Sequence, residues 1–397
     1  MVKILAVNAG SSTLKWKLFE MPQETEIASG MVDRLGLPGS TFAVKFNGEK
    51  TKDKIDIPDQ ETAVSLLLHR LTDSGIISDL TEIKGVGHRV VAGGEFFKES
   101  AEVTPENLQK ILELSDYAPL HNPNEAKGIE AFQHNLPHAK QVAVFDTSFH
   151  TSMPEVNYLY SVPLDYYHKY GARKYGAHGT SHRYVSQRAA EILGVPLKDQ
   201  KMITMHLGSG VSITAIKDGK SFDTSMGFTP LAGVTMSTRS GDIDASLVAF
   251  LMKKLDITDP DDMIDILNKQ SGLLGLSGLS PDMRDLLDTR AERPESQLAI
   301  DVFVNRIVKY VGQYVAEMGG VDTLVFTAGM GEGSIPVRKM IVDSLGFIGA
   351  KLDEEANKVQ AVEQVISAPD SKVKVLIVPT NEELMIVRDV VKLTELA

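Results

Sequence analysis

The fold of this chain is indicated by a segment near its start that recurs near its middle. Residues 4–12, ILAVNAGSS, resemble residues 203–210, ITMHLGSG, when Gly10 is aligned with Gly208, an offset of 198 positions in a chain of 397. Each copy is an apolar strand, a polar residue and a Gly-Ser turn, followed by a second strand with alternating polarity. A repeat at half the chain length indicates two copies of one fold.

The two Gly-Ser turns also predict where phosphate binds. Small residues let an anion approach the main chain, and successive N–H groups form an anion-binding concavity. Such turns also occur in hairpins of every function, and a repeat can be purely architectural, but two copies at half the chain length favour a polyphosphate site. A third turn, TAGMGEG at residues 327–333, follows an apolar strand and precedes a helix, whose positive end favours anions. The chain has no Gly-x-x-x-x-Gly-Lys-Ser/Thr motif, which excludes P-loop chemistry.

Strand-like and helix-like patterns alternate along the whole chain, which favours the α/β class. The clearest buried-strand candidates are residues 2–7, 84–91, 141–145, 202–206, 323–327 and 373–378. Helices are predicted at residues 61–72, 105–114, 181–193, 244–255, 295–318 and 382–396. Pro and Gly residues between positions 153 and 176 suggest a crossing between two domains.

Composition restricts the partners. The formal net charge of −12 argues against nucleic acid and anionic membrane surfaces, which are bound through basic patches. No apolar run approaches the roughly 18 residues that span a bilayer, and the short apolar start does not resemble a secretory signal. The absence of cysteine excludes disulfides and thiolate chemistry and fits a reducing compartment, so we expect a cytoplasmic protein.

Eight strings follow one another along the chain: NAGSSTLK (8–15), HRVVAGG (88–94), PLHNP (119–123), FDT (145–147), HGTSH (178–182), TRSGD (238–242), DMR (282–284) and PTNEE (379–383). In this order they resemble strings of the acetate kinase family, within the superfamily of actin, sugar kinases and the large heat-shock chaperones. The first two correspond to the two signatures of the family, and the matches span essentially the whole chain.

The resemblance implies an α/β fold of two duplicated actin-like, ribonuclease H-like domains with the active site in the interdomain cleft. The N-terminal domain would comprise residues 1–150, completed by a C-terminal helix at 383–397, and the nucleotide-binding domain residues 151–382. The implied reaction is reversible: ATP and acetate give ADP and acetyl phosphate, a step of acetyl-CoA biosynthesis, with Mg²⁺ as cofactor and Mn²⁺ as its alternative. A homodimer is also implied.

This reaction explains which residue types the site needs. A carboxylic acid is already ionised at pH 7, so no general base is required to make the nucleophile. The obstacle is the approach of two anions, which calls for arginines, a metal ion and oriented amides. By resemblance, Arg89 and Arg239 neutralise charge, His178 binds the transferring phosphoryl group, and Asp146 belongs to the catalytic set with a part in positioning Mg²⁺. His121 is expected in a supporting place nearby.

The remaining site residues are also assigned by resemblance. Asn8 and Glu382 are expected at the metal ion, because Mg²⁺ takes one or two protein oxygens together with phosphate and water. The alternative for Glu382 is a role at the helix N-terminus. The residues expected at ATP are Lys15, Ser11, Ser12, His206, Leu207, Gly208, Ser209, Gly210, Asp282, Met283, Arg284, Gly329, Met330, Gly331 and Glu332.

The acyl pocket contains a departure from the family pattern. Its four expected residues are Val91, Leu120, Ala177 and Pro230, and Ala177 stands where the family usually has phenylalanine. A smaller side chain leaves space for a longer acid unless neighbours move in. Two further departures, Ser209 and Gly333, replace asparagines of the family at the nucleotide turns.

Competing interpretations follow from the same residues. A propionate or butyrate kinase of the same family is the main alternative. A nucleotide-gated chaperone or filament subunit would need an appended domain or filament contacts, and we expect none because the chain ends one helix after Glu382. The His178 and His182 pair has the spacing of zinc ligands on a helix, but no glutamate of the zincin type stands between them.

Overall fold

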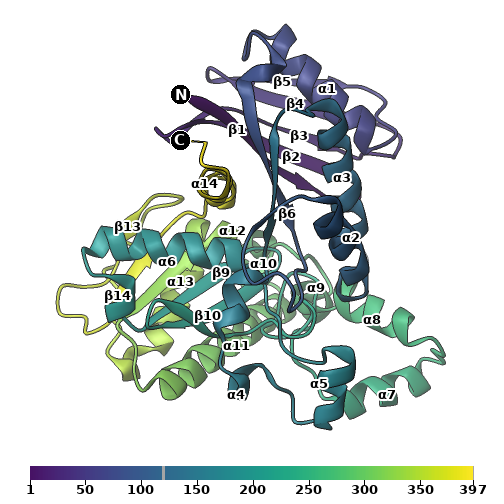
Figure 1. Ribbon diagram of the computed structural model, residues 1–397. Coiled ribbons are helices and arrows are strands. Elements are labelled where there is room, and N and C mark those ends of the chain that lie inside the picture. The colour runs from purple at the N-terminus through teal and green to yellow at the C-terminus, as the bar shows by residue number, and fades with distance from the viewer. Residues whose placement is uncertain (119–120, 397) are drawn as a thin grey trace. The chain divides into compact units, whose positions relative to one another are not determined.

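The structure is a computed structural model that describes residues 1–118 and 121–396. The chain folds into two compact units (Figure 1). Unit 1 comprises Met1–Ser148 and Asn381–Ala397, and unit 2 comprises Phe149–Thr380. Residues 153–176, where the sequence suggests a crossing between domains, belong wholly to unit 2. Their Pro and Gly residues instead accompany short helices and a left-handed helix end at Gly171.

Unit 1 is built on a mixed sheet with the strand order β5-β4-β3-β2-β1-β6-β8-β7. Its strands are β1 (Val2–Ala9), β2 (Thr13–Met21), β3 (Thr25–Asp33), β4 (Thr41–Phe46), β5 (Glu49–Lys54), β6 (Ile83–Val90), β7 (Ala101–Glu102) and β8 (Lys140–Phe145). Its helices are α1 (Gln60–Asp73), α2 (Pro105–Glu113), α3 (Asn122–Asn135) and α14 (Glu382–Thr394), with 3-10 turns η1 (Leu80–Glu82) and η2 (Leu114–Tyr117).

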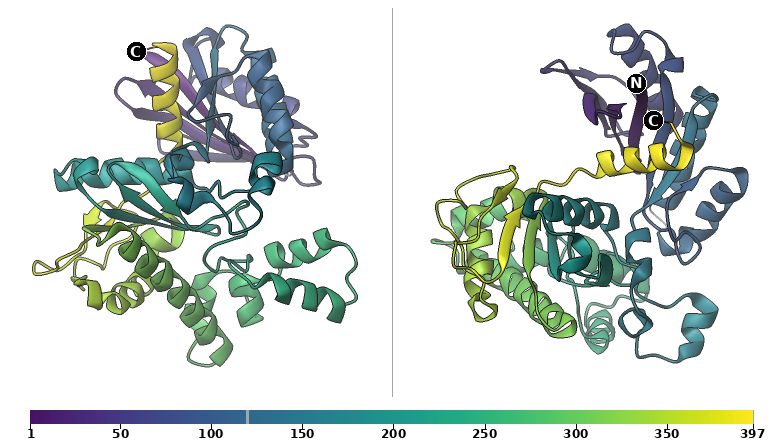
Figure 2. Two further views of the ribbon diagram at one scale, coloured as in Figure 1. Left: turned by 60° about the horizontal axis from the view of Figure 1, so that its bottom comes forward. Right: turned by 60° about the vertical axis from the view of Figure 1, so that its left-hand side comes forward.

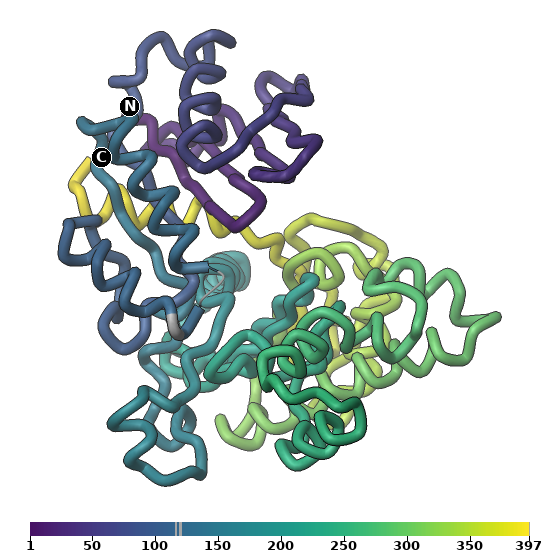
Figure 3. The backbone as a smooth tube through the Cα atoms, turned by 90° about the vertical axis from the view of Figure 1, so that its right-hand side faces the viewer, coloured from purple at the N-terminus to yellow at the C-terminus, as the bar shows by residue number. Residues whose placement is uncertain are grey.

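Helix α14 returns from the end of the chain to cover one face of this sheet, beside its first strand (Figure 3). Helices α1 and α3 pack on the opposite face, where the side chains of Leu5 and Val86 join the apolar core. On the α14 face, β6 carries Gly85 and Gly87. A Cβ atom on Gly87 would lie 2.3 Å from a methyl carbon of Ile386, so glycine is required for this close approach.

Unit 2 has a second mixed sheet with the order β11-β10-β9-β12-β14-β13. Its strands are β9 (Met202–Leu207), β10 (Val211–Lys217), β11 (Lys220–Thr224), β12 (Thr323–Thr327), β13 (Gln364–Val365) and β14 (Lys374–Ile377). Its helices are α4 (Glu155–Tyr158), α5 (Leu164–Tyr170), α6 (Gly179–Leu193), α7 (Ala245–Lys254), α8 (Pro260–Lys269), α9 (Gly272–Ser277), α10 (Met283–Thr289), α11 (Pro294–Met318), α12 (Ala328–Gly333) and α13 (Ile335–Ser344), with 3-10 turns η3 (Ser148–Ser152), η4 (Leu197–Asp199) and η5 (Gly346–Ile348).

The two sheets share one topology, which confirms the duplicated α/β fold. In unit 1, β1 pairs antiparallel with β2 and parallel with β6, and β6 pairs parallel with β8. In unit 2, β9 pairs antiparallel with β10 and parallel with β12, and β12 pairs parallel with β14. The Gly-Ser turns that resemble each other in sequence therefore connect equivalent strands, β1–β2 and β9–β10.

The two faces of the unit 2 sheet differ in polarity. Helix α11 packs on one face of this sheet (Figure 2). On that face the apolar side chains of Met205 and Phe326 join the core. On the other face, beneath α6, the strands present polar side chains, and the antiparallel register places Ser212 opposite His206 and Thr214 opposite Thr204. This polar face supports the N-terminus of α6.

The strand and helix candidates of the sequence analysis are confirmed, with ends that shift by one or two residues. Residues 328–333 differ from the expected turn, because they form the short helix α12, which begins at Ala328 in a left-handed conformation. In the part of the chain that the structure describes, no helix is long and apolar enough to cross a membrane.

Candidate active site

In unit 1, Arg89 and Asp146 form a charged pair at neighbouring strand ends. Arg89 lies near the end of β6, and Asp146 follows β8, the parallel neighbour of β6. The Arg89 guanidinium donates to Asp146 Oδ2 from Nε at 2.9 Å and from Nη2 at 2.5 Å. The Asp146 side chain is 2% exposed and that of Arg89 is 19% exposed. Burial opposes the charge of Arg89, but surrounding carboxylates raise its pKa, so it remains cationic.

Asn8 and Glu382 extend this cluster from both ends of the chain. Asn8, the polar residue near the end of β1, accepts a long 3.5 Å contact from Arg89 Nη1 on its Oδ1. Glu382 is the first residue of α14. Burial raises the pKa of Glu382 to about 7, with the carboxylate of Asp146 acting in the same direction and Arg89 opposing it. The structure therefore brings together the expected residues Asn8, Arg89, Asp146 and Glu382.

Glu125 is a further member of this cluster that the sequence analysis missed. It lies in the first turn of α3, is buried, and accepts the backbone N–H of Val91 on Oε2 at 3.0 Å. Burial raises its pKa to about 7 although Arg89 lowers it. Nothing in the string around His121 distinguished this glutamate, because its burial results from the packing of α3 on the sheet.

Polar contacts support the Gly-Ser turn of unit 1. The Gly10 N–H donates to Thr13 O at 2.8 Å, and Gln60 of α1 donates to Gly10 O at 2.8 Å. Ser11 is exposed, Ser12 is half-buried, and Lys15 is exposed on β2. These positions leave the turn accessible while its backbone is held in place.

The turn of unit 2 adjoins two histidines and an arginine. The Gly208 N–H donates to Gly210 O at 3.1 Å, and the ring of His206 stacks on that of His178 with centroids 4.0 Å apart. A Cβ atom on Gly210 would lie 3.2 Å from His178 Nε2 and 3.3 Å from Arg239 Nη1. Gly210 thus preserves a space towards which the side chains of His178 and Arg239 both point. The structure therefore brings these expected residues together.

Arg239 lies on a loop that its neighbours hold tightly. Its Nη1 donates to Pro230 O at 3.3 Å, and burial lowers the pKa of the guanidinium. The Ser237 N–H donates to Ser209 O at 3.1 Å, which ties this loop to the Gly-Ser turn of unit 2. Gly272 has a φ of +61°, and a Cβ atom there would lie 2.2 Å from Met236 O. The loop carrying Arg239 is therefore fixed before any substrate arrives.

The other residues expected at ATP lie on α10 and α12. Asp282 caps α10 and pairs with Arg284, whose Nη2 lies 2.6 Å from Asp282 Oδ2, while the next residue, Met283, is buried. Within the described residues, no hydrogen bond or ion pair joins Asp282 or Arg284 to His178 or Arg239.

Glu332 of α12 has a structural task that the sequence did not reveal. Its Oε1 accepts the N–H groups of Ala328 at 2.7 Å and Thr380 at 3.0 Å. Arg338, fully buried on α13, donates from Nη1 to the carbonyls of Gly331 and Glu332. The burial of Arg338 could not be predicted from the sequence, because an arginine is usually a surface residue. Gly329 is exposed and Met330 half-buried beside these contacts.

The expected acyl residues are distributed over both units. Val91 of unit 1 and Ala177 of unit 2 are buried at 7% and 6% exposure, and Pro230 of unit 2 is half-buried. Leu120 lies outside the described residues. His121, at the start of α3, is exposed.

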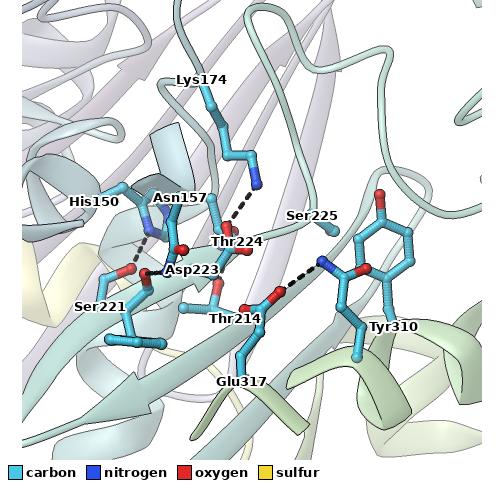
Figure 4. Close-up of polar contacts among 12 residues, drawn as sticks. His150, Asn157, Lys174, Thr214, Ser221, Asp223, Thr224, Ser225, Tyr310 and Glu317 are labelled. Carbon is cyan, nitrogen blue, oxygen red and sulfur yellow. Dashed lines mark hydrogen bonds and ion pairs between the residues drawn. The ribbon is translucent and has the colours of Figure 1, made fainter. Parts of the chain in front are cut away.

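Buried polar contacts anchor the segment that leads into Ala177 and His178 (Figure 4). Lys174 Nζ lies 2.5 Å from Asp223 Oδ1 of β11, and the Asp223 side chain is 3% exposed. A Cβ atom on Gly176 would lie 2.4 Å from the Thr224 methyl carbon, so this segment presses directly on β11. The hydrogen bond between His150 Nδ1 and Ser221 Oγ, at 2.8 Å, lies in the same region.

The residues of unit 1 fit a magnesium ion as one or two protein ligands. Among the described residues no three His, Asp or Glu side chains gather as a complete metal cage. Mg²⁺ does not require one, because it usually keeps several waters and binds through one or two carboxylates and the phosphates of its substrate. Burial raises the pKa of Glu382 and the neighbouring carboxylate of Asp146 acts in the same direction, so a divalent cation would relieve the repulsion between the two carboxylates.

Comparisons with known proteins agree along the whole chain. Residues 3–388 match the model of the acetokinase family. The chain is 64% identical to acetate kinase 1 of Latilactobacillus sakei, covering 99% of this chain and 100% of that protein. It is 60% identical to the acetate kinase of Enterococcus faecalis, with 99% and 100% covered.

Solved structures give the same result. The crystal structure of Porphyromonas gingivalis acetate kinase has a TM-score of 0.95 at 45% identity, covering 99% of this chain and 100% of that one. A propionate kinase from Francisella tularensis has a TM-score of 0.91 at 38% identity, covering 97% and 98%. The family match over nearly all residues and the identity to these relatives lead to one conclusion: the chain belongs to the acetokinase family.

Proposed function

We propose that this protein is an acetate kinase, which transfers the γ-phosphoryl group of ATP reversibly to acetate by direct in-line displacement, giving acetyl phosphate and ADP. The observation that carries the proposal is the 64% identity, over both full lengths, to a protein named acetate kinase. The arrangement of cations and carboxylates supports the same chemistry, because a transfer between two anions requires neutralisation of charge rather than proton transfer.

In the proposed mechanism, Arg89 attracts the carboxylate of acetate. Its charge is secured by Asp146, which also fixes the guanidinium through two hydrogen bonds to one oxygen. Arg239 neutralises the charge that spreads over the phosphoryl oxygens as the bond to ADP breaks, and His178 donates a hydrogen bond to one of these oxygens. The space that Gly210 preserves beside both side chains supports this pairing of roles. Because acetate arrives ionised, the enzyme moves no proton to form the new bond.

Nucleotide binding is assigned to the turns and helices described above. The backbone of residues 206–210, together with Ser11 and Ser12, would hold the phosphates, and Lys15 would add a positive charge. Asp282, Met283 and Arg284 would frame the adenosine. On α12 we assign nucleotide contact to the exposed Gly329 and to Met330, whereas the Glu332 carboxylate already accepts two backbone N–H groups of its own chain.

We assign the magnesium site to Asn8 and Glu382, with Asp146 beside them. Bound there, the ion would neutralise phosphate charge and orient the nucleotide. The carboxylate and amide oxygens at this place are the donors that a hard cation prefers. Mn²⁺, which favours similar ligands, is the alternative.

We also propose a homodimer and a cytoplasmic location. Unit 2 exposes several large apolar side chains, including Val156 at 85%, Tyr170 at 67% and Leu255 at 55% exposure. Exposed apolar surface of this kind is available for a subunit interface. Light scattering on the purified protein should give twice the mass of the 43.3 kDa chain. A cytoplasmic location follows from the proposed substrates, since ATP and ADP are held in that compartment.

The decisive experiment is the formation of acetyl hydroxamate from acetate, ATP, Mg²⁺ and hydroxylamine. Acetyl phosphate reacts with hydroxylamine, so acetyl hydroxamate should form only when acetate, nucleotide and metal are all present. Absence of product from correctly folded protein, with acetate at saturating concentration, would reject the proposed function.

The acyl-chain preference is tested with the same assay, and propionate or butyrate is the alternative substrate. Ala177 is smaller than the phenylalanine usual at this position, and each methylene in an apolar pocket is worth about 1–3 kcal/mol. If the space is open, propionate should be used with a kcat/KM within about tenfold of that for acetate, and Ala177→Phe should restore preference for acetate. If both proteins reject propionate by about a hundredfold, Ala177 does not shape the acyl pocket.

A further inference from the structure

His178 stands at one end of a chain of buried hydrogen bonds. Its Nδ1 lies 2.8 Å from Ser212 Oγ of β10, and the same oxygen lies 2.7 Å from His182 Nε2 on α6. The other ring nitrogen of His182, Nδ1, lies 2.7 Å from Thr204 Oγ1 of β9. Ser212, His182 and Thr204 are all completely excluded from solvent. The chain therefore connects β9 to the nitrogen of His178 that faces away from Gly210.

The secondary structure makes this chain possible. His178 caps the N-terminus of α6, and His182 lies one turn later on the same face of the helix. Ser212 and Thr204 lie on the polar face of the β9–β10 pair that α6 covers. The hydroxyl of Ser212 is thereby shared by two rings, and this sharing explains the His178 and His182 spacing without a zinc ion.

The number of hydrogen atoms that this series of hydrogen bonds can use is limited. A hydroxyl has one hydrogen to donate, and a neutral imidazole has one N–H and one acceptor nitrogen. His182 is neutral, because burial lowers its pKa well below the ordinary value, with His150 and His206 acting in the same direction. Within the described residues, Ser212 Oγ bonds only to the two rings and Thr204 Oγ1 only to His182.

Two proton arrangements satisfy the Ser212 hydroxyl, and they differ at Thr204. In the first, Thr204 donates to His182 Nδ1, His182 Nε2–H donates to Ser212, and Ser212 donates to His178 Nδ1. Every buried hydrogen then has an acceptor. In the second, all three bonds are reversed, and the Thr204 hydrogen is left without an acceptor in a fully buried site. Leaving a buried donor unpaired shifts an equilibrium by about tenfold or more, so the first arrangement prevails.

We propose that Thr204, His182 and Ser212 are positioning residues that set the tautomer of His178, so that its single hydrogen lies on Nε2. This nitrogen faces the space beside Gly210 that it shares with Arg239 Nη1. In the reversed arrangement a bare lone pair would face the same space and repel a phosphoryl oxygen. The use of this N–H as a phosphoryl donor rests on the proposed function, whereas the tautomer itself does not.

The test compares Thr204→Val with Thr214→Val. Both substitutions replace a buried hydroxyl by a methyl group of similar shape, and Thr214 pairs with Thr224 rather than with a histidine. In protein labelled with ¹⁵N-histidine, two-bond ¹H–¹⁵N spectra assign the proton of each ring, and the His178 signal is identified by its loss in His178→Ala. Wild type and Thr214→Val should show the Nε2–H tautomer, and Thr204→Val should show increased Nδ1–H.

The proposal is overturned if wild-type His178 carries its hydrogen on Nδ1, or if Thr204→Val leaves the tautomer ratio unchanged. Ser212→Ala is a second variant with the same expectation, should Thr204→Val fold poorly. This measurement requires no activity, so it decides the inference even if the wild-type protein forms no acetyl phosphate, a result that would reject the proposed function alone.

Kinetics separate positioning from a structural role. Thr204→Val should lower kcat by about twofold while KM for ATP stays constant, because loss of the tenfold bias reduces the productive tautomer from about nine-tenths to about half of the population. In a His178→Ala background, Thr204→Val should cause no further loss, since the ring it acts through is gone. An equal additional loss in that background would show general damage and contradict the proposed coupling.

Discussion

Glu125→Gln should stabilise unit 1 at alkaline pH and leave its stability unchanged at acid pH. The substitution replaces a buried carboxylate by an uncharged amide of nearly the same shape, and its oxygen can still accept the Val91 N–H. The pKa of Glu125 rises from an ordinary 4.5 to about 7 on folding, chiefly through burial. This difference corresponds to a destabilisation of about 3 kcal/mol when the group is ionised in both states.

The sign follows from proton binding. Above pH 7 the carboxyl is ionised in the folded and unfolded states, and the folded state carries the full cost of the buried charge. As the pH falls from about 7 towards 4.5, the folded state takes up a proton that the unfolded state does not bind, so the cost disappears. Near pH 5 and below, a protonated Glu125 and a glutamine should therefore be nearly equivalent.

The assay uses the single tryptophan of the chain. Trp16 is buried in unit 1, so its fluorescence during urea unfolding reports on the unit that contains Glu125. Glu125→Gln should raise the free energy of unfolding by about 3 kcal/mol near pH 8.5 and by less than about 1 kcal/mol near pH 5. Glu130→Gln, on the exposed face of the same helix, is the control and should show no such pH dependence. An equal gain at both pH values, or no gain at pH 8.5, would refute the reasoning.

Four further substitutions test the site and the packing. Arg89→Ala and Arg239→Ala should each lower kcat by about 10³-fold or more, since each removes a cation from a reaction in which two anions must approach each other. A variant with near-normal kcat and unchanged circular dichroism would reject the role of that arginine. Glu382→Ala should raise the Mg²⁺ concentration for half-maximal rate, whereas an unchanged magnesium titration would support a helix-terminal role. Gly87→Ala should destabilise unit 1 by about 1–3 kcal/mol because its Cβ overlaps Ile386, and thermal unfolding at the wild-type temperature would contradict the close packing of α14.

Much of the fold could be predicted from local pattern. The apolar strands and the helices followed from periodicity, and the structure adds the cap of α1, where the Asp59 side chain accepts the Thr62 N–H. The duplication was visible because both Gly-Ser turns need small residues at the same place. The structure corrected two local expectations: residues 328–333 form a helix, and the segment 153–176 lies inside unit 2. In both cases the glycines of the segment were compatible with more than one backbone path.

The candidate site was predicted unevenly. Matched strings identified Arg89, Asp146, Asn8 and Glu382, which the structure brings together in unit 1. No string identified Glu125, because its raised pKa results from its burial where α3 packs on the sheet. The same limit applied to His182, whose spacing from His178 was visible but whose role depends on the hydroxyl of Ser212 on another strand.

The sequence alone therefore determined the class of fold, its duplication, the family and the residue types that carry the chemistry, since these depend on order and spacing along the chain. The tertiary structure decided which groups are buried and which hydrogen bonds they share. Desolvation, the pKa of Glu125 and the tautomer of His178 depend on atoms contributed by distant segments, and no periodicity within one segment records those neighbours.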